Sequence, residues 1–477
     1  MKESPIVADR IDIYSFHCYN LSMSPPSDRA RTQTKQSTLF EAGDGPPSEV
    51  NASGPRRGRP RLRTANRTQI VFRAAPLDAL IPDDHPARAV WDYVEGLDLS
   101  ALYGRIKAVE HGPGRAPIDP RILMALWLYA TIEGIGSARH LDKLCGAHAA
   151  FQWLVGDVAI NYHTLSDFRT DHVELLDDML TRGVAALMAE GLVDLNRVAQ
   201  DGMRVRASAG AASFRRRPTL EEALAQAEAQ VEALCAELED DPAASDRREA
   251  GARQRTARER AERVRAALGR LPELEARKKA GERDQARCST TDADATVMKM
   301  GDGGFRPAYN VQFATDAGSQ VITGVAVITS GSDAGQMAPM VEQVEERTGK
   351  VPPEWLVDGG FAQHDQIETV SAPGTGCTVY APVPKPKDPK VDRYAAKPGD
   401  SPAVAAWRER MGTDQAKAIY KERAATAECV NAQARNRGLV RLLVRGLVKV
   451  KAIALWYALA QNLMCAMRLR AASTGGT

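Results

Sequence analysis

The sequence has few features of a structural metal site, a disulfide framework or a membrane anchor. Its seven cysteines include no C-x-x-C pair, so neither a zinc site nor a disulfide framework is indicated, and the odd number favours reduced thiols. The longest charge-free apolar stretch, residues 452–467, is too short for a membrane span and contains Gln461 and Asn462. The first residues do not show a basic segment followed by an apolar one. We therefore expect a soluble, cytoplasmic protein.

Acidic residues are missing from two basic stretches. Residues 55–67 contain six arginines and no acid, and the residues after Glu428 contain eight Lys or Arg and again no acid. The formal net charge of the chain is only +2, but local blocks of this kind favour a phosphate backbone as partner. The alternative is a solvated tail and an ordinary basic helix. Together the two stretches favour nucleic acid.

The first 66 residues are rich in Pro, Gly, Ser, Thr and charge, which predicts a disordered basic tail. Within it, Arg57, Arg59 and Arg61 belong to an Arg-Gly-Arg-Pro-Arg segment that resembles an AT-hook. The arginines of such an arm enter the narrow minor groove of A·T-rich DNA. A merely basic linker is the alternative.

Two further segments have helical periodicity. Residues 67–192 space their apolar residues at three and four, which predicts an all-α domain with helix starts at Asp119-Pro120 and Ser166. This domain either binds DNA as helix-turn-helix units do or is plain helical packing. Residues 215–287 predict a helical hairpin, either an intramolecular arm or a dimerisation device. Its coiled-coil seam comprises Leu220, Leu224, Ala227, Val231, Leu234, Leu238, Ala257, Ala261, Val264, Leu268 and Leu271.

Short β runs alternate with helices in residues 193–214 and 288–440. The predicted order is β-β-β-α-β-α-β-α, the order of the RNase H-like fold, so the fold class is α/β. In this order Asp201 ends the first strand, Asp358 ends the fourth and Glu428 lies on the final helix. Ligand sites of α/β sheets collect at the carboxyl ends of strands. Taken singly, the two Asp-Gly pairs are turn signals, and Glu428 is an ordinary exposed helix residue.

The final predicted helix carries a more specific pattern. Tyr420, Arg423, Glu428 and Arg435 have the spacing Tyr-x2-Arg-x4-Glu-x6-Arg. Over most of residues 68–470, this pattern and the segments QDGMRVRAS, TTDADATVMKM, GFRPAYNVQ and LVDGGF resemble bacterial insertion-sequence transposases of the DDE class. The signature of that family ends in Lys, and arginine is not equivalent to lysine at a tuned phosphate contact.

The resemblance implies a mechanism. Asp201, Asp358 and Glu428 would be the catalytic residues and would bind two Mg²⁺ or Mn²⁺ ions, as carboxylates do in two-metal phosphodiester chemistry. The enzyme would bind terminal inverted repeats and catalyse DNA strand cleavage and strand transfer. The alternatives are a catalytically inactive, transposase-derived DNA-binding protein and a DDE nuclease with a cellular role.

Further DNA contacts are expected around and after this helix. Tyr420, Arg423 and Arg435 would contact the DNA near the scissile phosphate. In residues 441–477 we expect a basic and apolar helix and tail. The basic stripe, spaced by four, comprises Arg437, Arg441, Arg445 and Lys449, and the packing face comprises Leu443, Leu447, Val450 and Leu459. The resemblance implies double-stranded DNA as the partner, and we expect the protein to bind it as a homodimer and to associate with the nucleoid.

Overall fold

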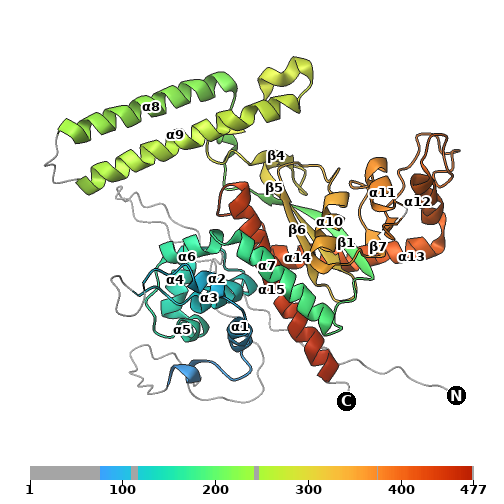
Figure 1. Cartoon of the computed structure of the whole chain (residues 1–477). Coiled ribbons are helices and arrows are strands. Elements are labelled where there is room, and N and C mark those ends of the chain that lie inside the picture. The colour runs from blue at the N-terminus through green and yellow to red at the C-terminus, as the bar shows by residue number, and fades with distance from the viewer. Residues whose placement is uncertain (1–75, 109–115, 241–246, 373, 475–477) are drawn as a thin grey trace, which may run out of the picture. The chain divides into compact units, whose positions relative to one another are not determined.

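The computed structural model describes residues 76–108, 116–240, 247–372 and 374–474 (Figure 1). The chain divides into two units, residues 1–72 and 73–477, and all described residues belong to the second unit. This unit combines many helices with a mixed sheet, so the predicted α/β class is confirmed. The AT-hook-like segment with Arg57, Arg59 and Arg61 lies outside the described residues.

The predicted all-α segment contains helices throughout. Asp119 caps the helix that begins at Pro120, because its carboxylate accepts a hydrogen bond from the Arg121 backbone N–H. Ser166 lies inside a helix that begins after Asn161, so its prediction as a helix start was wrong. The helices are η1 (Leu77–Leu80), α1 (Pro86–Glu95), α2 (Ser100–Tyr103), α3 (Pro120–Ile132), α4 (Ala138–Ala147), α5 (Ala149–Val155), α6 (Tyr162–Thr170) and α7 (Val173–Ala189).

One mixed sheet forms the centre of the α/β part. Strand β5 pairs antiparallel with β1, β4 and β6, while β1 pairs parallel with β7 and β7 pairs parallel with β8. The path through the sheet is β4-β5-β1-β7-β8, with β6 also on β5. The strands are β1 (Arg197–Arg206), β4 (Thr296–Lys299), β5 (Phe305–Asp316), β6 (Ile322–Ile328), β7 (Glu354–Leu356) and β8 (Thr378–Tyr380).

Helices follow these strands, mostly as the periodicity predicts. The expected long final helix is a continuous helical run in which a π-helical turn, η4, separates two α-helices. The run ends at residue 436. The helices are α10 (Met337–Thr348), α11 (His364–Val370), α12 (Pro402–Gly412), α13 (Asp414–Arg423), η4 (Ala424–Glu428) and α14 (Cys429–Asn436).

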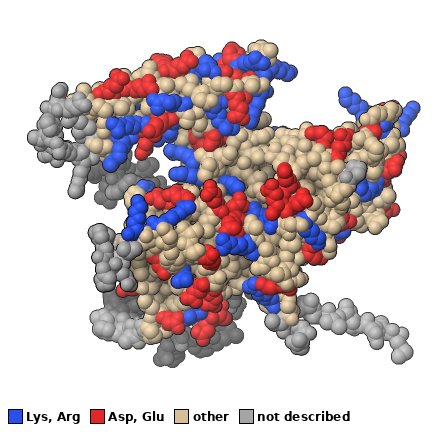
Figure 2. Space-filling view, in the orientation of Figure 1, with Lys and Arg blue, Asp and Glu red and all other residues tan. Residues whose placement is uncertain are grey.

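The insertion between β1 and β4 is a helical hairpin, in which α8 (Arg217–Asp240) packs against α9 (Arg247–Ala276). Of the expected seam, Leu220, Ala227, Ala257, Ala261, Val264 and Leu271 are buried. Acidic and basic side chains intermingle along the hairpin in Figure 2, and pairs such as Arg265 with Glu228 join its two helices. Beside it lie η2 (Ala211–Ser213), η3 (Ala280–Gln285), β2 (Phe214–Arg215) and β3 (Cys288–Ser289), and the last two form a small sheet.

The last helix, α15 (Leu447–Thr474), joins the helical and sheet-containing parts of the core. It contacts α3, α6 and α7 from the helical part and β6 from the sheet. By length and composition, residues 447–473 could cross a membrane, but 83% of the apolar window is buried inside the protein. The helix is therefore a core helix of this structure, longer than the apolar stretch that the sequence suggests.

The prediction that the basic stripe lies along one helix is wrong. Residues 437–446 connect α14 to α15 without forming a helix, and Gly438 and Gly446 have positive φ angles of 91° and 87°. Such angles suit glycine and end a helix. Leu443, expected on the packing face, is exposed, whereas Val450 and Leu459 are buried as expected.

Asn462 attaches α15 to the sheet. Its side chain accepts a hydrogen bond from the Ile322 N–H and donates one to the Ile322 carbonyl, at 2.7 and 2.8 Å. We expect Asn462→Ala to lower the free energy of unfolding by about 1–3 kcal/mol, because buried backbone groups would lose their partners. Urea denaturation would measure this. Ser473→Ala, at an exposed position on the same helix, is the control, and an equal loss in both variants would contradict the interpretation.

Candidate active site

Asp201 lies in the middle of β1, not at its end as the sequence suggested, because the strand continues through Gly202 to residue 206. Its carboxylate accepts hydrogen bonds from the Gly202 N–H and the Asn431 side chain, both at 3.0 Å. Burial raises the pKa of Asp201, Arg423 opposes this rise and Asp358 adds to it. The carboxylate is thus held by several donors in a partly dehydrated place beside a second acid.

The parallel pairing of β1 with β7 brings Asp358 close to Asp201. Ala199 is the partner of Leu356 in the register, and Asp201 and Asp358 each follow two residues later. Because β7 ends at residue 356, Asp358 lies in the turn beyond it, where its carboxylate accepts a hydrogen bond from the Gly360 N–H at 2.8 Å. Strand pairing therefore brings together two acids that are far apart in the chain.

The π-helical turn η4 brings the third acid into the site. In an α-helix, residues five apart lie about 140° apart around the axis, since each residue turns about 100°. In a π-helix the repeat is i→i+5, so Arg423 and Glu428 can share one face. Their side chains form an ion pair at 2.9 Å, and Arg423 also pairs with Asp201 at 3.2 Å. The guanidinium therefore bridges a strand acid and a helix acid.

Tyr420, one turn before Arg423, lies beside the same charges. Burial raises the pKa of its phenol, and Asp358, Glu428 and Asp201 raise it further. The pKa of Arg423 is also raised, because Asp201 and the other neighbouring groups outweigh the effect of burial. The structure thus brings Tyr420, Arg423 and the three predicted acids together. Arg435, the last residue of the signature, is exposed on α14.

The donor types suit a hard cation, although the present arrangement is not that of a metal centre. Carboxylate oxygens are the ligands that Mg²⁺ prefers, and the buried Oδ1 of Asn431 has no hydrogen-bond partner among the described residues. No group of three or more Asp, Glu, His or Cys in the described part is gathered closely enough to hold a metal. Here the Arg423 guanidinium supplies the positive charge between Asp201 and Glu428.

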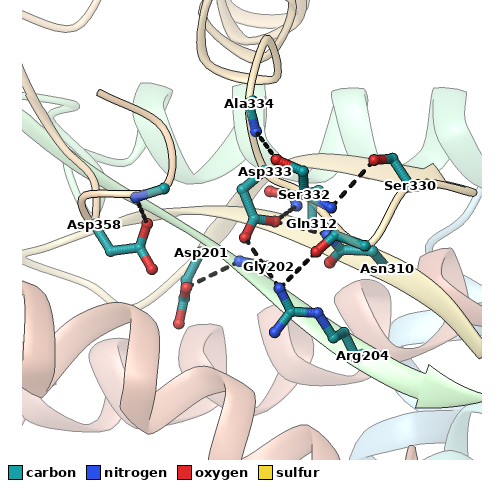
Figure 3. Close-up of polar contacts among 12 residues, drawn as sticks. Asp201, Gly202, Arg204, Asn310, Gln312, Ser330, Ser332, Asp333, Ala334 and Asp358 are labelled. Atoms are coloured by element: carbon teal, nitrogen blue, oxygen red, sulfur yellow. Dashed lines mark hydrogen bonds and ion pairs between the residues drawn. The ribbon is translucent and has the colours of Figure 1, made fainter. Parts of the chain in front are cut away.

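A fourth acid, Asp333, lies on the opposite side of β1 and was not predicted from the sequence. Figure 3 shows its carboxylate on one side of the strand and Asp201 on the other. Asp333 accepts hydrogen bonds from Asn310 and Gln312, both at 2.6 Å, and lies 3.8 Å from the Arg204 guanidinium. Because it precedes α10 in a Ser-Gly-Ser-Asp loop, its only local signal is that of a turn residue.

Gly202 leaves room for Asp333. A Cβ at this position would lie within 3.0 Å of the side chains of Asp333, Gln312 and Asn310. The glycine of the Asp-Gly pair is therefore required by close packing within a strand, and the turn that this dipeptide suggests does not form. Asp333 also lies near the position that a Cβ would take at Gly360, so it contacts the segments that carry both aspartates.

The other predicted DNA contacts have mixed surroundings. Arg437 is half-buried and donates a hydrogen bond to Gln461 on α15 at 2.6 Å, so this side chain takes part in packing. The sequence analysis instead predicted that Arg437 would be exposed and would contact a phosphate. Arg441, Arg445 and Lys449 are exposed in or next to the connection between α14 and α15. The role of these three residues stays a prediction.

Two family models match the chain. One is a transposase domain, DUF772, over residues 75–171, and the other is a transposase DDE domain over residues 376–465, which includes Glu428. No curated protein and no solved structure matches. The two matches confirm the resemblance to a DDE transposase of an insertion sequence. They support a transposase function, with the nuclease or transposase activity that a DDE domain implies and with DNA as the partner.

The packing of Gly202 can be tested independently of activity. We expect Gly202→Ala to lower the free energy of unfolding by about 1–3 kcal/mol, because the added methyl overpacks the site around Asp333. Gly210→Ala is a matched control, since its Cβ would meet nothing within 4 Å and its φ is −92°. Urea unfolding of both variants would give the difference. Equal stability of the two would show that the space at residue 202 is not required.

Proposed function

We propose that this protein cleaves DNA at the terminal inverted repeats of its element and transfers the freed 3′ end to target DNA. The observation that carries the proposal is that Arg423 pairs with both Asp201 and Glu428, while Asp358 lies close enough to Asp201 to raise its pKa. The three acids come from a strand, a turn after a neighbouring strand and a π-helical turn. Catalytic groups gathered from separate elements onto a rigid sheet are typical of an active site.

The three carboxylates would hold two divalent cations, Mg²⁺ or Mn²⁺. Held by these residues, the cations would supply the Lewis acidity that hydrolysis and transfer of a phosphodiester require. Asn431 orients the Asp201 carboxylate through its amide hydrogen bond. Arg423 is a charged donor beside the acids and suits a phosphate oxygen, while the phenol of Tyr420, kept protonated by its raised pKa, can donate to the same group.

The strand arrangement supports an RNase H-like catalytic domain formed by residues 193–214 and 288–440. Across the sheet, the neighbouring strands are β6, β5, β1, β7 and β8. In the predicted order along the chain, these are strands 3, 2, 1, 4 and 5. The first three pair antiparallel and the last two join in parallel. The helical hairpin of residues 215–287 would be an insertion with a coiled-coil seam, and residues 67–192 a helical DNA-binding domain.

The proposed partners follow from this activity. Double-stranded DNA is the substrate, and two ends of one element are most simply joined by a homodimer that forms on DNA. Transposases are typically cytoplasmic, and we expect this protein to associate there with the nucleoid. Arg435, Arg441, Arg445 and Lys449 are exposed and remain our proposed backbone contacts.

Loss of one carboxylate should abolish cleavage but not binding. We expect Asp201→Asn, Asp358→Asn and Glu428→Gln each to lower the rate of Mg²⁺-dependent cleavage of a labelled inverted-repeat duplex by about a thousandfold, as removal of several kcal/mol of transition-state stabilisation requires. Glu346→Gln, an exposed position on α10, is the control and should cleave normally.

The outcome separates the alternatives. Duplex binding without metal-dependent cleavage in the wild-type protein would favour the inactive DNA-binding protein. Cleavage that is unaffected by the three substitutions would exclude these acids as its cause. Cleavage of duplexes without any preference for repeat ends would favour a DDE nuclease with a cellular role.

Arg423 and the divalent cations should compete for the same carboxylates. We expect Mg²⁺ to raise the melting temperature of Arg423→Gln more than that of the wild-type protein, because the variant lacks the resident positive charge and a bound ion stabilises the folded state. Differential scanning calorimetry with and without Mg²⁺ would measure this. Adding Glu428→Gln to Arg423→Gln should reduce the effect, and equal Mg²⁺ shifts in all three proteins would contradict the competition.

A further inference from the structure

Arg169 on α6 is a buried arginine without an acidic partner. The residue is only 6% exposed, and its contacts among the described residues, the Gly136 carbonyl and the Trp127 ring, include no carboxylate. Its Nη1 donates to the Gly136 carbonyl and its guanidinium lies over the Trp127 ring at 4.4 Å, but the buried Nε has no hydrogen-bond partner. Burial lowers the pKa of Arg169 to about 10, so it stays charged at neutral pH. A buried charge of this kind is costly unless it is compensated.

This guanidinium lines a cavity of about 360 Å³ that has other groups suited to an anion. The N-terminal end of α4 contributes its N-cap Ser137 and Arg139 from its first turn, and a helix N-terminus attracts negative charge. His163 and Ser166 contribute an imidazole and a hydroxyl from α6. The Asp167 carboxylate also lines the cavity and opposes anion binding, but two guanidinium groups outweigh it.

The cavity is accessible and lies next to the segment that follows the candidate active site. Arg139, His163 and Ser166 are exposed, and Arg139 lies over the Tyr162 ring at 4.9 Å. Leu443 and Val444, from the connection between α14 and α15, form part of its wall. A ligand here would therefore contact the helical part and the segment directly after the helix that contains Arg435.

We propose that this cavity binds a backbone phosphate of the duplex on which the protein acts, with Arg169 and Arg139 as its charged ligands. The proposal rests on the proposed function only in taking DNA as the partner. The geometry suits a phosphate because a guanidinium offers paired, planar donors, and the Ser137 and Ser166 hydroxyls add neutral ones. Binding would supply the negative charge that Arg169 lacks within the described residues.

The test measures binding of a labelled duplex to the full-length protein in EDTA, over a series of KCl concentrations, by fluorescence anisotropy. We expect Arg139→Gln to weaken binding by about tenfold, or about 1.4 kcal/mol, and to reduce the slope of log K against log salt by about 0.9, the value for one phosphate contact. Arg182→Gln is the matched control, because it removes an exposed arginine of α7 that pairs with Asp98 and Asp178.

Two further variants guard against misfolding at the buried position. Arg169→Gln should lose affinity at least as strongly as Arg139→Gln, while Arg169→Lys should recover part of it, with circular dichroism confirming the fold of each. In a thermal-shift measurement, inorganic phosphate should stabilise the wild-type protein relative to chloride at equal ionic strength, and Arg139→Gln should reduce this shift.

Wild-type affinity and salt slope in Arg139→Gln would overturn the proposal. Stabilisation by inorganic phosphate with unchanged duplex binding would identify a free-anion site and also overturn the assignment to DNA. Because the measurement contains no divalent metal, it does not depend on cleavage. Weaker duplex binding in these variants, together with a wild-type protein that fails to cleave, would support this site and reject the proposed strand-cleavage activity.

Discussion

Three carboxylates drawn toward one another repel, and the Arg423 guanidinium offsets that repulsion by pairing with Asp201 and Glu428 together. The pairing depends on the π-helical turn, because a regular α-helix would point residues 423 and 428 in different directions. The Arg423 ion pairs therefore connect the π-helical turn, which carries Glu428, to strand β1, which carries Asp201. The same arrangement gives the site a resident positive charge, which an incoming cation or phosphate must displace or share.

The sheet holds the other half of the site through contacts on both of its faces. On one face Asp201 receives donors from Gly202, Asn431 and Arg423. On the opposite face Asp333 is bound by amides of β5 and occupies the space left by the missing side chain of Gly202. Asp201 and Gly202 are adjacent in one strand, and each lies against a different polar cluster. A substitution at Gly202 would therefore disturb both the loop before α10, which carries Asp333, and the neighbouring Asp201.

Much of this arrangement could be predicted from the sequence. Alternating β runs predicted β1, β5, β6, β7 and β8, and their expected order brought Asp201 and Asp358 together. The π turn was not predicted, because one turn of i→i+5 bonds leaves a single spacing of five, that of Arg423 and Glu428, which is too little periodicity to recognise. The prediction of the basic stripe was wrong because Gly438 and Gly446 adopt positive φ angles that end a helix, whatever the spacing of the basic residues. Asp333 depends on a contact between remote segments, for which a single sequence carries no local signal.

The helix α15 has a consequence for the order in which the molecule is made. It is synthesised after every residue of the candidate site, yet it packs against α3, α6, α7 and β6. Until it has left the ribosome, a nascent chain exposes the apolar surfaces that this helix later covers. The fold around the sheet can therefore close only after α15 has been synthesised, and apolar surface left uncovered before that stage is prone to aggregation.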